Sequence, residues 1–176
     1  MFLNRLFRPK AARDAGQVLF AKAVERARRP ELYQQLAAPD TLEGRFEIYT
    51  AYVVLLLDRL GGKGLQARET AQALFEAYVS SLDNALREIG VGDLSVGKKM
   101  RTLGEAFYGR VKSYEQAFAD LPDRGPLEAL LVRTVYAETD AGTAPQLADL
   151  LLTERSALAA IPIEDVLEAR ITWAQA

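Results

Sequence analysis

A long apolar stripe between residues 96 and 121 constrains the fold of this 176-residue chain more than any other feature. Apolar side chains recur there in steps of three and four, a spacing that places them on one face of an α-helix. The positions are Val96, Met100, Leu103, Phe107, Val111, Tyr114, Phe118 and Leu121. The pattern predicts a long amphipathic helix near residues 94–120 whose apolar face belongs to the core.

The opposite side of this predicted helix is basic. It carries Glu105 as its one acid, and its cations are Lys98, Lys99, Arg101, Arg110 and Lys112. We expect this side to face solvent. Three glycines, Gly97, Gly104 and Gly109, interrupt the same helix. Because each glycine costs a helix about 1 kcal/mol relative to alanine, we expect another element to pack closely against them.

Further helices are predicted on both sides of the long one. They span residues 15–29, 30–36, 40–60, 66–89, 127–138, 146–160 and 164–169. Asp40 and Glu43 have the spacing of a capping box at the start of 40–60, and the apolar surface of that helix is wide enough for burial on more than one side. The tail at residues 170–173 is expected to lie extended, with Trp173 as its anchor. The sequence predicts an all-α, single-domain bundle of about six to eight helices over residues 15–176.

Residues 1–14 form a separate basic, amphipathic segment in this interpretation. Residues 1–30 carry eight Lys/Arg against two Asp/Glu, whereas residues 115–176 carry four against eleven. Contact with an anionic membrane surface is predicted for Phe2, Leu3, Arg5, Leu6, Phe7 and Arg8. The alternative is a frayed or docked terminus. The longest apolar run, residues 51–57, is too short for a transmembrane helix.

The chain contains neither cysteine nor histidine. This composition excludes disulfides, thiolate nucleophiles, Ser-His-Asp catalysis and the common zinc and haem ligand sets. Carboxylates such as Glu43 and Glu47 are interpreted as surface charge. The tyrosines near core-facing positions are interpreted as buried rings, with a hydrophobic ligand cavity as the alternative; they are Tyr49, Tyr52, Tyr78, Tyr108 and Tyr114. No catalytic residue, metal site or cofactor is predicted.

Residues 92–98 match part of a phosphate-binding loop, G-x-x-x-x-G-K. The next position is Lys99, where that motif needs a serine or threonine for magnesium, and a helix precedes the loop instead of a strand. Nucleotide hydrolysis is therefore not expected. An anion site on the first amides of the helix is the alternative, although Asp93 opposes it. Asp93 or Ser95 is more simply the helix cap.

Two blocks of residues carry a family resemblance. The upstream block is Pro39-Asp40-Thr41 with Gly44-Arg45-Phe46-Glu47, and the downstream block is Asp83, Leu86-Arg87-Glu88, Gly90-Val91-Gly92-Asp93-Leu94, Val96, Lys98-Lys99-Met100 and Phe107-Tyr108-Gly109-Arg110. Together they resemble the signature of the ubiquinol–cytochrome c chaperone family over residues 18–120. Tyr52 stands where members of that family often have histidine, and the chain matches more loosely from about Gly125.

The resemblance implies a non-enzymatic assembly factor for the respiratory cytochrome bc1 complex. Its protein client would be newly made cytochrome b, with further contacts to the ribosome or to anionic membrane, and with no DNA or nucleotide ligand. The implied partner-binding residues lie on the basic face and the connecting turn: Arg87, Glu88, Asp93, Lys98, Lys99, Arg101, Arg110 and Lys112. The expected location is the bacterial cytoplasm, peripheral to the membrane, or the mitochondrial matrix side in a eukaryote.

Two other functions remain open. A generic helical module that contacts ribosomes, RNA or another membrane-protein client would bind in a salt-sensitive way. A small-molecule binder or enzyme would need a closed cavity with convergent polar groups.

Overall fold

The structure, a computed structural model, describes residues 3–137 and 142–174, and the side chains of residues 10–92, 95–137 and 142–174. These residues form eight α-helices and no strand, which confirms the predicted fold class. In chain order the helices are α1 (Leu3–Ala27), α2 (Pro30–Gln34), α3 (Leu42–Leu60), α4 (Leu65–Glu88), α5 (Asp93–Ala119), α6 (Gly125–Thr134), α7 (Ala144–Ala160) and α8 (Ile163–Leu167).

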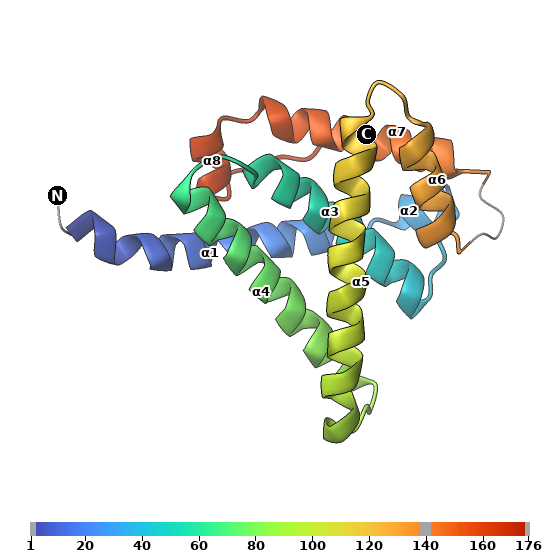
Figure 1. Cartoon of the computed structure of the whole chain (residues 1–176), viewed down its shortest axis with the longest axis horizontal. Coiled ribbons are helices and arrows are strands. Elements are labelled where there is room, and N and C mark those ends of the chain that lie inside the picture. Colours follow the sequence, from blue (N-terminus) through green and yellow to red (C-terminus); the bar gives the residue numbers. More distant parts are fainter. Residues whose placement is uncertain (1–2, 138–141, 175–176) are drawn as a thin grey trace.

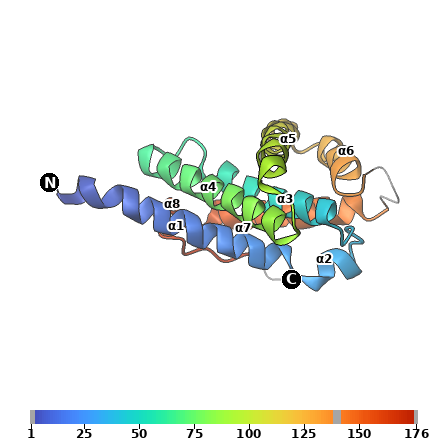
Figure 2. The same cartoon turned by 90° about the horizontal axis from the view of Figure 1, so that it is seen from below.

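Helix α3 lies in the middle of the molecule. It contacts α1, α4, α5 and α7, and Figure 2 shows it between α1 on one side and α5 on the other. Ile48, Tyr52 and Leu56 are fully buried on this helix. Its burial on more than one side, predicted from its wide apolar surface, is confirmed.

Helices α4 and α5 form a long hairpin that projects from the body (Figure 1). Their connection turns at Gly90, whose φ of +82° lies in the left-handed region that glycine adopts without a steric penalty. The predicted stripe of α5 faces inward along the helix, since Val96, Phe107 and Tyr114 are each at most 2% exposed. The long amphipathic helix is thus confirmed.

An aromatic cluster fastens the base of this hairpin to the body. The ring centroid of Phe107 lies 5.1 Å from that of Phe75 and 4.9 Å from that of Tyr78. The Tyr78 hydroxyl lies 2.7 Å from the hydroxyl oxygen of Thr50 on α3, and both side chains are buried. The hydrogen bond therefore satisfies the polar groups that the cluster takes out of water.

Several helix starts differ from the predicted ones. The helix predicted to begin at residue 15 begins at Leu3 instead: α1 continues through Pro9 and already buries Ala12. The cap of α3 is Thr41 rather than Asp40: the Thr41 hydroxyl accepts from the Gly44 amide at 3.1 Å, whereas Asp40 pairs with Arg45.

The C-terminal third contains the other differences. Helix α6 ends at Thr134 instead of near Glu138, which lies outside the described residues, and Ala137 has a positive φ of 49°. Pro145, which precedes the predicted helix start at residue 146, lies in the first turn of α7, where the missing amide hydrogen of proline has no partner to lose.

The tail packs as predicted. Ile171 is 3% exposed, and the indole Nε1 of Trp173 donates to the Lys22 carbonyl at 3.2 Å. The Trp173 ring also meets Tyr52 edge-on, with centroids 5.3 Å apart. The role of Trp173 as the anchor of an extended tail is confirmed.

None of the helices in the described residues combines the length and the apolar character that a membrane span requires.

Candidate functional site

An ion pair joins the two sequence blocks, which lie far apart along the chain. Arg110 on α5 donates to both carboxylate oxygens of Glu47 on α3, at 2.8 and 2.7 Å. Glu47 is only 8% exposed, so it is not the surface charge that the sequence suggested. Hydrogen bonding to this carboxylate raises the pKa of Arg110. The prediction that Arg110 belongs to the exposed basic side is wrong, because the residue faces α3.

Steric crowding explains the glycine at position 44 in the upstream block. A Cβ at Gly44 would lie 2.0 Å from the carbonyl oxygen of Pro39. The chain before α3 folds back over the first turn of that helix, and any larger residue would push it away. This arrangement places Phe46 and Glu47 at the side of α3 that faces the α4–α5 hairpin.

A mainly apolar groove lies where the start of α3 meets the tip of the hairpin; we call it the hairpin groove. Its cavity volume is about 550 Å³. Phe46 from α3, Leu86 from α4 and Leu103 from α5 line it. Leu42 and Ile89 also line the groove and are 53% and 59% exposed. Large apolar side chains this exposed mark a surface able to take an apolar partner.

Two of the predicted basic residues border this groove. Lys98 and Lys99 line it and are exposed. Neither of them forms an ion pair within the described residues, and the same holds for Arg101 and Lys112, which are exposed on α5 outside the groove. The groove therefore presents free positive charge beside its apolar surface.

The remaining predicted site residues lie elsewhere. Arg87 pairs with Asp83 one turn earlier on α4, at 2.6 Å. Glu88 faces a different cleft, described below. Asp93 is the first residue of α5 and Gly92 is its cap residue. Of the eight residues predicted for partner binding, the structure brings Lys98 and Lys99 together at a cavity with apolar walls.

The glycines of α5 contradict their expected role. A Cβ added at Gly97, Gly104 or Gly109 would meet nothing within 4 Å. These positions lie on the part of the helix that no other element covers. Close packing occurs instead at Gly16 on α1, where an added Cβ would lie 2.6 Å from both the Cβ of Ala73 and the backbone nitrogen of Leu74 on α4.

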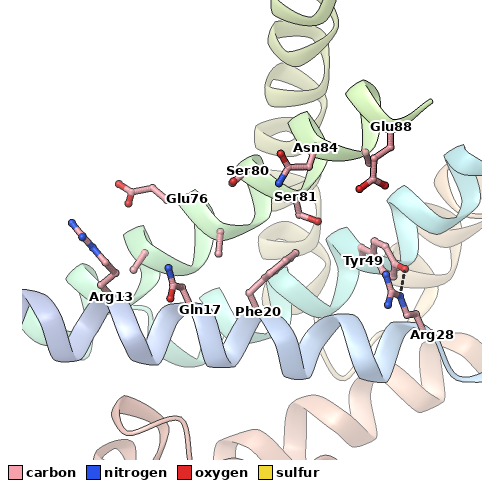
Figure 3. A pocket seen from close by; sticks show the side chains of 13 residues that line it. Arg13, Gln17, Phe20, Arg28, Tyr49, Glu76, Ser80, Ser81, Asn84 and Glu88 are labelled. Carbon is pink, nitrogen blue, oxygen red and sulfur yellow. Dashed lines mark hydrogen bonds between the residues drawn. The ribbon is translucent and has the colours of Figure 1, made fainter. Parts of the chain in front are cut away.

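A second cleft, which the sequence did not reveal, separates α1 from the outer part of α4. Its cavity volume is about 820 Å³. Figure 3 shows Arg13, Gln17 and Phe20 on the α1 side and a row of mostly small polar side chains on α4. The sequence signal was present, since these α1 residues recur in steps of four and three. The predicted helix begins at residue 15, so Arg13 falls outside it.

The tyrosines divide into buried and exposed groups. Tyr52, Tyr78 and Tyr114 are at most 1% exposed, and burial raises the pKa of each. Tyr108 is 63% exposed, so its expected place near the core is wrong. No closed, tyrosine-lined cavity is found at the two sites described here.

Catalytic and phosphate-binding arrangements find little support in the described residues. No group of three or more aspartates and glutamates there could hold a metal ion. The loop that resembles a phosphate-binding motif follows helix α4, not a strand. The buried carboxylates Glu47 and Glu154 are both engaged by arginines.

Comparison with known proteins gives consistent results. The family model described as ubiquinol-cytochrome C chaperone matches residues 34–173, including the part after Gly125 whose resemblance to the family is looser. The crystal structure of the Cbp3 homolog from Brucella abortus aligns with a TM-score of 0.87 and 30% identity, over 99% of this chain and 97% of that one. A search of the curated proteins found no significant match.

Proposed function

The chain belongs to the ubiquinol-cytochrome C chaperone family, and we propose that it binds newly made cytochrome b through the hairpin groove during assembly of the cytochrome bc1 complex. In this proposal the protein acts by binding, without catalysis. It works on the inner face of a bacterial cytoplasmic membrane, where the client is inserted.

The observation that carries the proposal is the exposed apolar surface of the hairpin groove. Leu42 and Ile89 flank a cavity large enough for several apolar side chains. A membrane protein that is not yet assembled exposes apolar helices, and burying such a surface is favourable by about 25 cal/mol per Å². The groove also unites the two sequence blocks that characterise the family.

Lys98 and Lys99 add positive charge to the border of the apolar groove. Their ammonium groups would meet acidic side chains that flank an apolar client segment, or the phosphates of nearby anionic lipid. Such contacts at the rim steer and orient a client more than they add affinity.

Ribosome contact is the second candidate function. It is favoured by Lys98, Lys99, Arg101 and Lys112, which are exposed and free of ion pairs within the described residues. Binding of this kind weakens steeply with salt, because it depends on neutralised phosphates. Contact of residues 1–8 with membrane also remains a prediction, since Phe2 and the side chains of Leu3, Arg5, Leu6, Phe7 and Arg8 lie outside the described ones.

The first experiment deletes the gene and measures assembled bc1 complex and haem-loaded cytochrome b in membranes. We expect a selective loss of cytochrome b. Complementation with wild-type protein should restore the level of cytochrome b. The double variant L42D/I89D should lower the amount of cytochrome b that the protein captures on the order of tenfold, as loss of a central apolar contact does. Leu65→Asp is the matched control, because Leu65 is 60% exposed but lies at the opposite end of α4 from the groove.

The outcomes separate the claims. Unchanged bc1 complex after deletion contradicts the proposed client. Full rescue by L42D/I89D contradicts the hairpin groove as the binding site but leaves cytochrome b as the proposed client. Salt-sensitive ribosome capture that is lost on charge reversal of Lys98, Lys99 and Arg101, with normal cytochrome b, favours the second candidate.

A further inference from the structure

The cleft between α1 and α4 is a second candidate surface, on a different side of α4 from the hairpin groove. The two helices meet closely where Gly16 faces Ala73. Beyond this crossing they diverge, and Figure 3 shows α4 rising away from α1. The space between them measures about 820 Å³ and remains open to solvent along its length. Because the two helices touch at one end and diverge at the other, the gap between them can accommodate a third element.

The two walls of this cleft carry opposite charge. Arg13 stands on α1, Arg28 directly follows the last residue of α1, and Glu76 and Glu88 stand on α4. None of the four forms an ion pair within the described residues. Arg28 donates to the Tyr49 hydroxyl at 3.0 Å, and Glu76 accepts from Gln72 at 3.0 Å. All four charges are therefore available to a partner that presents the complementary pattern.

The inner surface is small on one wall and apolar at its centre. The α4 wall contributes Ala77, Ser80 and Ser81, while Phe20 projects from α1. Small side chains allow a neighbouring helix to approach closely, and Phe20 provides an apolar contact at the centre of the cleft. The backbone groups of α1 and α4 are already paired within their own helices, so the cleft has no strand edge for an extended peptide.

From these features we propose that the α1–α4 cleft docks an amphipathic α-helix of a partner protein, with acidic residues along one edge and basic residues along the other. The acidic edge meets Arg13 and Arg28, and the basic edge meets Glu76 and Glu88. At 1.5 Å per residue, Arg13 lies about 21 Å along α1 from Ala27, the residue before Arg28, and Glu76 and Glu88 are about 18 Å apart along α4. The docked helix is therefore about 12 to 15 residues long. A nucleic acid or an anionic membrane fits less well, because Glu76 and Glu88 repel phosphates. This inference does not depend on the client of the hairpin groove.

The test uses three synthetic, covalently stapled helices of 15 residues with the same small and apolar face. One has glutamates on one edge and lysines on the other, one has glutamates on both edges, and one has lysines on both. Fluorescence anisotropy with the full chain should show the mixed helix binding roughly tenfold more tightly than either single-sign helix, the sum of several exposed ion pairs. A mixed helix with exchanged edges is not a control, because it can bind in the reversed direction.

Charge reversal of one wall at a time makes the test decisive. R13E/R28E makes both walls acidic and should transfer the preference to the all-lysine helix. E76K/E88K makes both walls basic and should transfer it to the all-glutamate helix. Circular dichroism verifies that both variants keep the wild-type helix content.

Three results would overturn the proposal. The first is equal binding of the three peptides to the wild-type chain, and the second is an unchanged preference in either charge-reversal variant. The third is binding of an RNA oligonucleotide or of anionic phosphatidylglycerol vesicles that is lost in R13E/R28E and exceeds binding of the mixed helix.

Discussion

Two cationic residues on α5 have very different surroundings. Arg110 inserts its guanidinium against Glu47 of α3, with both hydrogen bonds shorter than 3 Å, whereas Lys98 is exposed to solvent. Both fall outside the apolar stripe in the sequence, but Arg110 lies at the edge nearest α3. A long basic side chain at the edge of a helix face can turn inward when a carboxylate on the neighbouring helix is within reach.

This difference predicts unequal costs for two matched substitutions. Arg110→Ala should lower the free energy of unfolding by about 1–3 kcal/mol, because it leaves the nearly buried Glu47 carboxylate without its partner. Lys98→Ala should change it by less than about 0.5 kcal/mol, as exposed substitutions do. Urea unfolding followed by circular dichroism measures both. Equal costs would mean that the Glu47–Arg110 pair contributes nothing beyond an exposed charge.

At the scale of the helices, glycine has opposite meanings in α1 and α5. Gly16 sits where α1 and α4 touch, and an added Cβ would come within 2.6 Å of the Leu74 backbone nitrogen. Gly104 lies in the middle of α5 with open space around it. Gly16 therefore sets the distance between α1 and α4, whereas Gly104 only lowers the helix propensity of α5.

Alanine at these two positions should therefore act in opposite directions. Gly16→Ala should destabilise the protein by about 1–3 kcal/mol through overpacking against backbone that cannot move aside easily. Gly104→Ala should stabilise it by up to about 1 kcal/mol, the usual helix-propensity gain. Thermal and urea unfolding of both variants provide the measurement. A neutral Gly16→Ala would show that α1 and α4 can separate at their crossing without cost.

For the whole molecule, the tail closes the structure by connecting its first and last thirds. The Ala174 amide donates to Glu154 of α7 at 2.7 Å, and Arg26 of α1 donates to the Ala174 carbonyl at 2.7 Å. Arg26 and Glu154 also pair with each other, and Glu154 is fully buried. One ion pair thus holds both backbone groups of a single tail residue, and Tyr52 of α3 packs beneath it against Trp173.

Buried tyrosines predict the pH dependence of stability for the molecule as a whole. Tyrosine in an unfolded chain releases its proton near pH 10, whereas burial raises the pKa of Tyr52, Tyr78 and Tyr114, and raises that of Tyr33 to about 12. Above pH 10 the unfolded state therefore binds fewer protons than the folded state. The free energy of unfolding should fall by up to about 1.4 kcal/mol per pH unit for each fully buried tyrosine.

Alkaline titration checks this expectation. Tyrosinate absorbance should rise together with the loss of helical circular dichroism, beginning above pH 10. Between pH 6 and 9 the stability should be nearly constant, because the chain has no histidine or cysteine to titrate there. Ionisation of all tyrosines near pH 10 in a chain that still has its full helix content would contradict the protective effect of burial.

The sequence by itself determined the fold class, the position of most helices and the family. These features depend on local order: apolar residues in steps of three and four, prolines and glycines between helices, and two blocks of residues at a recognisable separation. The sequence predicted helix ends less accurately. Helix α1 begins twelve residues before its predicted start, and the cap of α3 is Thr41 instead of Asp40.

Only the tertiary structure decided which polar and small residues are available at the surface. Glu47 and Arg110 look like solvated charges in one dimension, and they become a nearly buried pair because α3 and α5 pack side by side. Gly16 is a contact and Gly104 is not, although both lie inside helices. The hairpin groove exists because α3, α4 and α5 meet at angles, and the α1–α4 cleft exists because α1 and α4 do. The spacing of residues within one helix carries no information about the angle to the next helix.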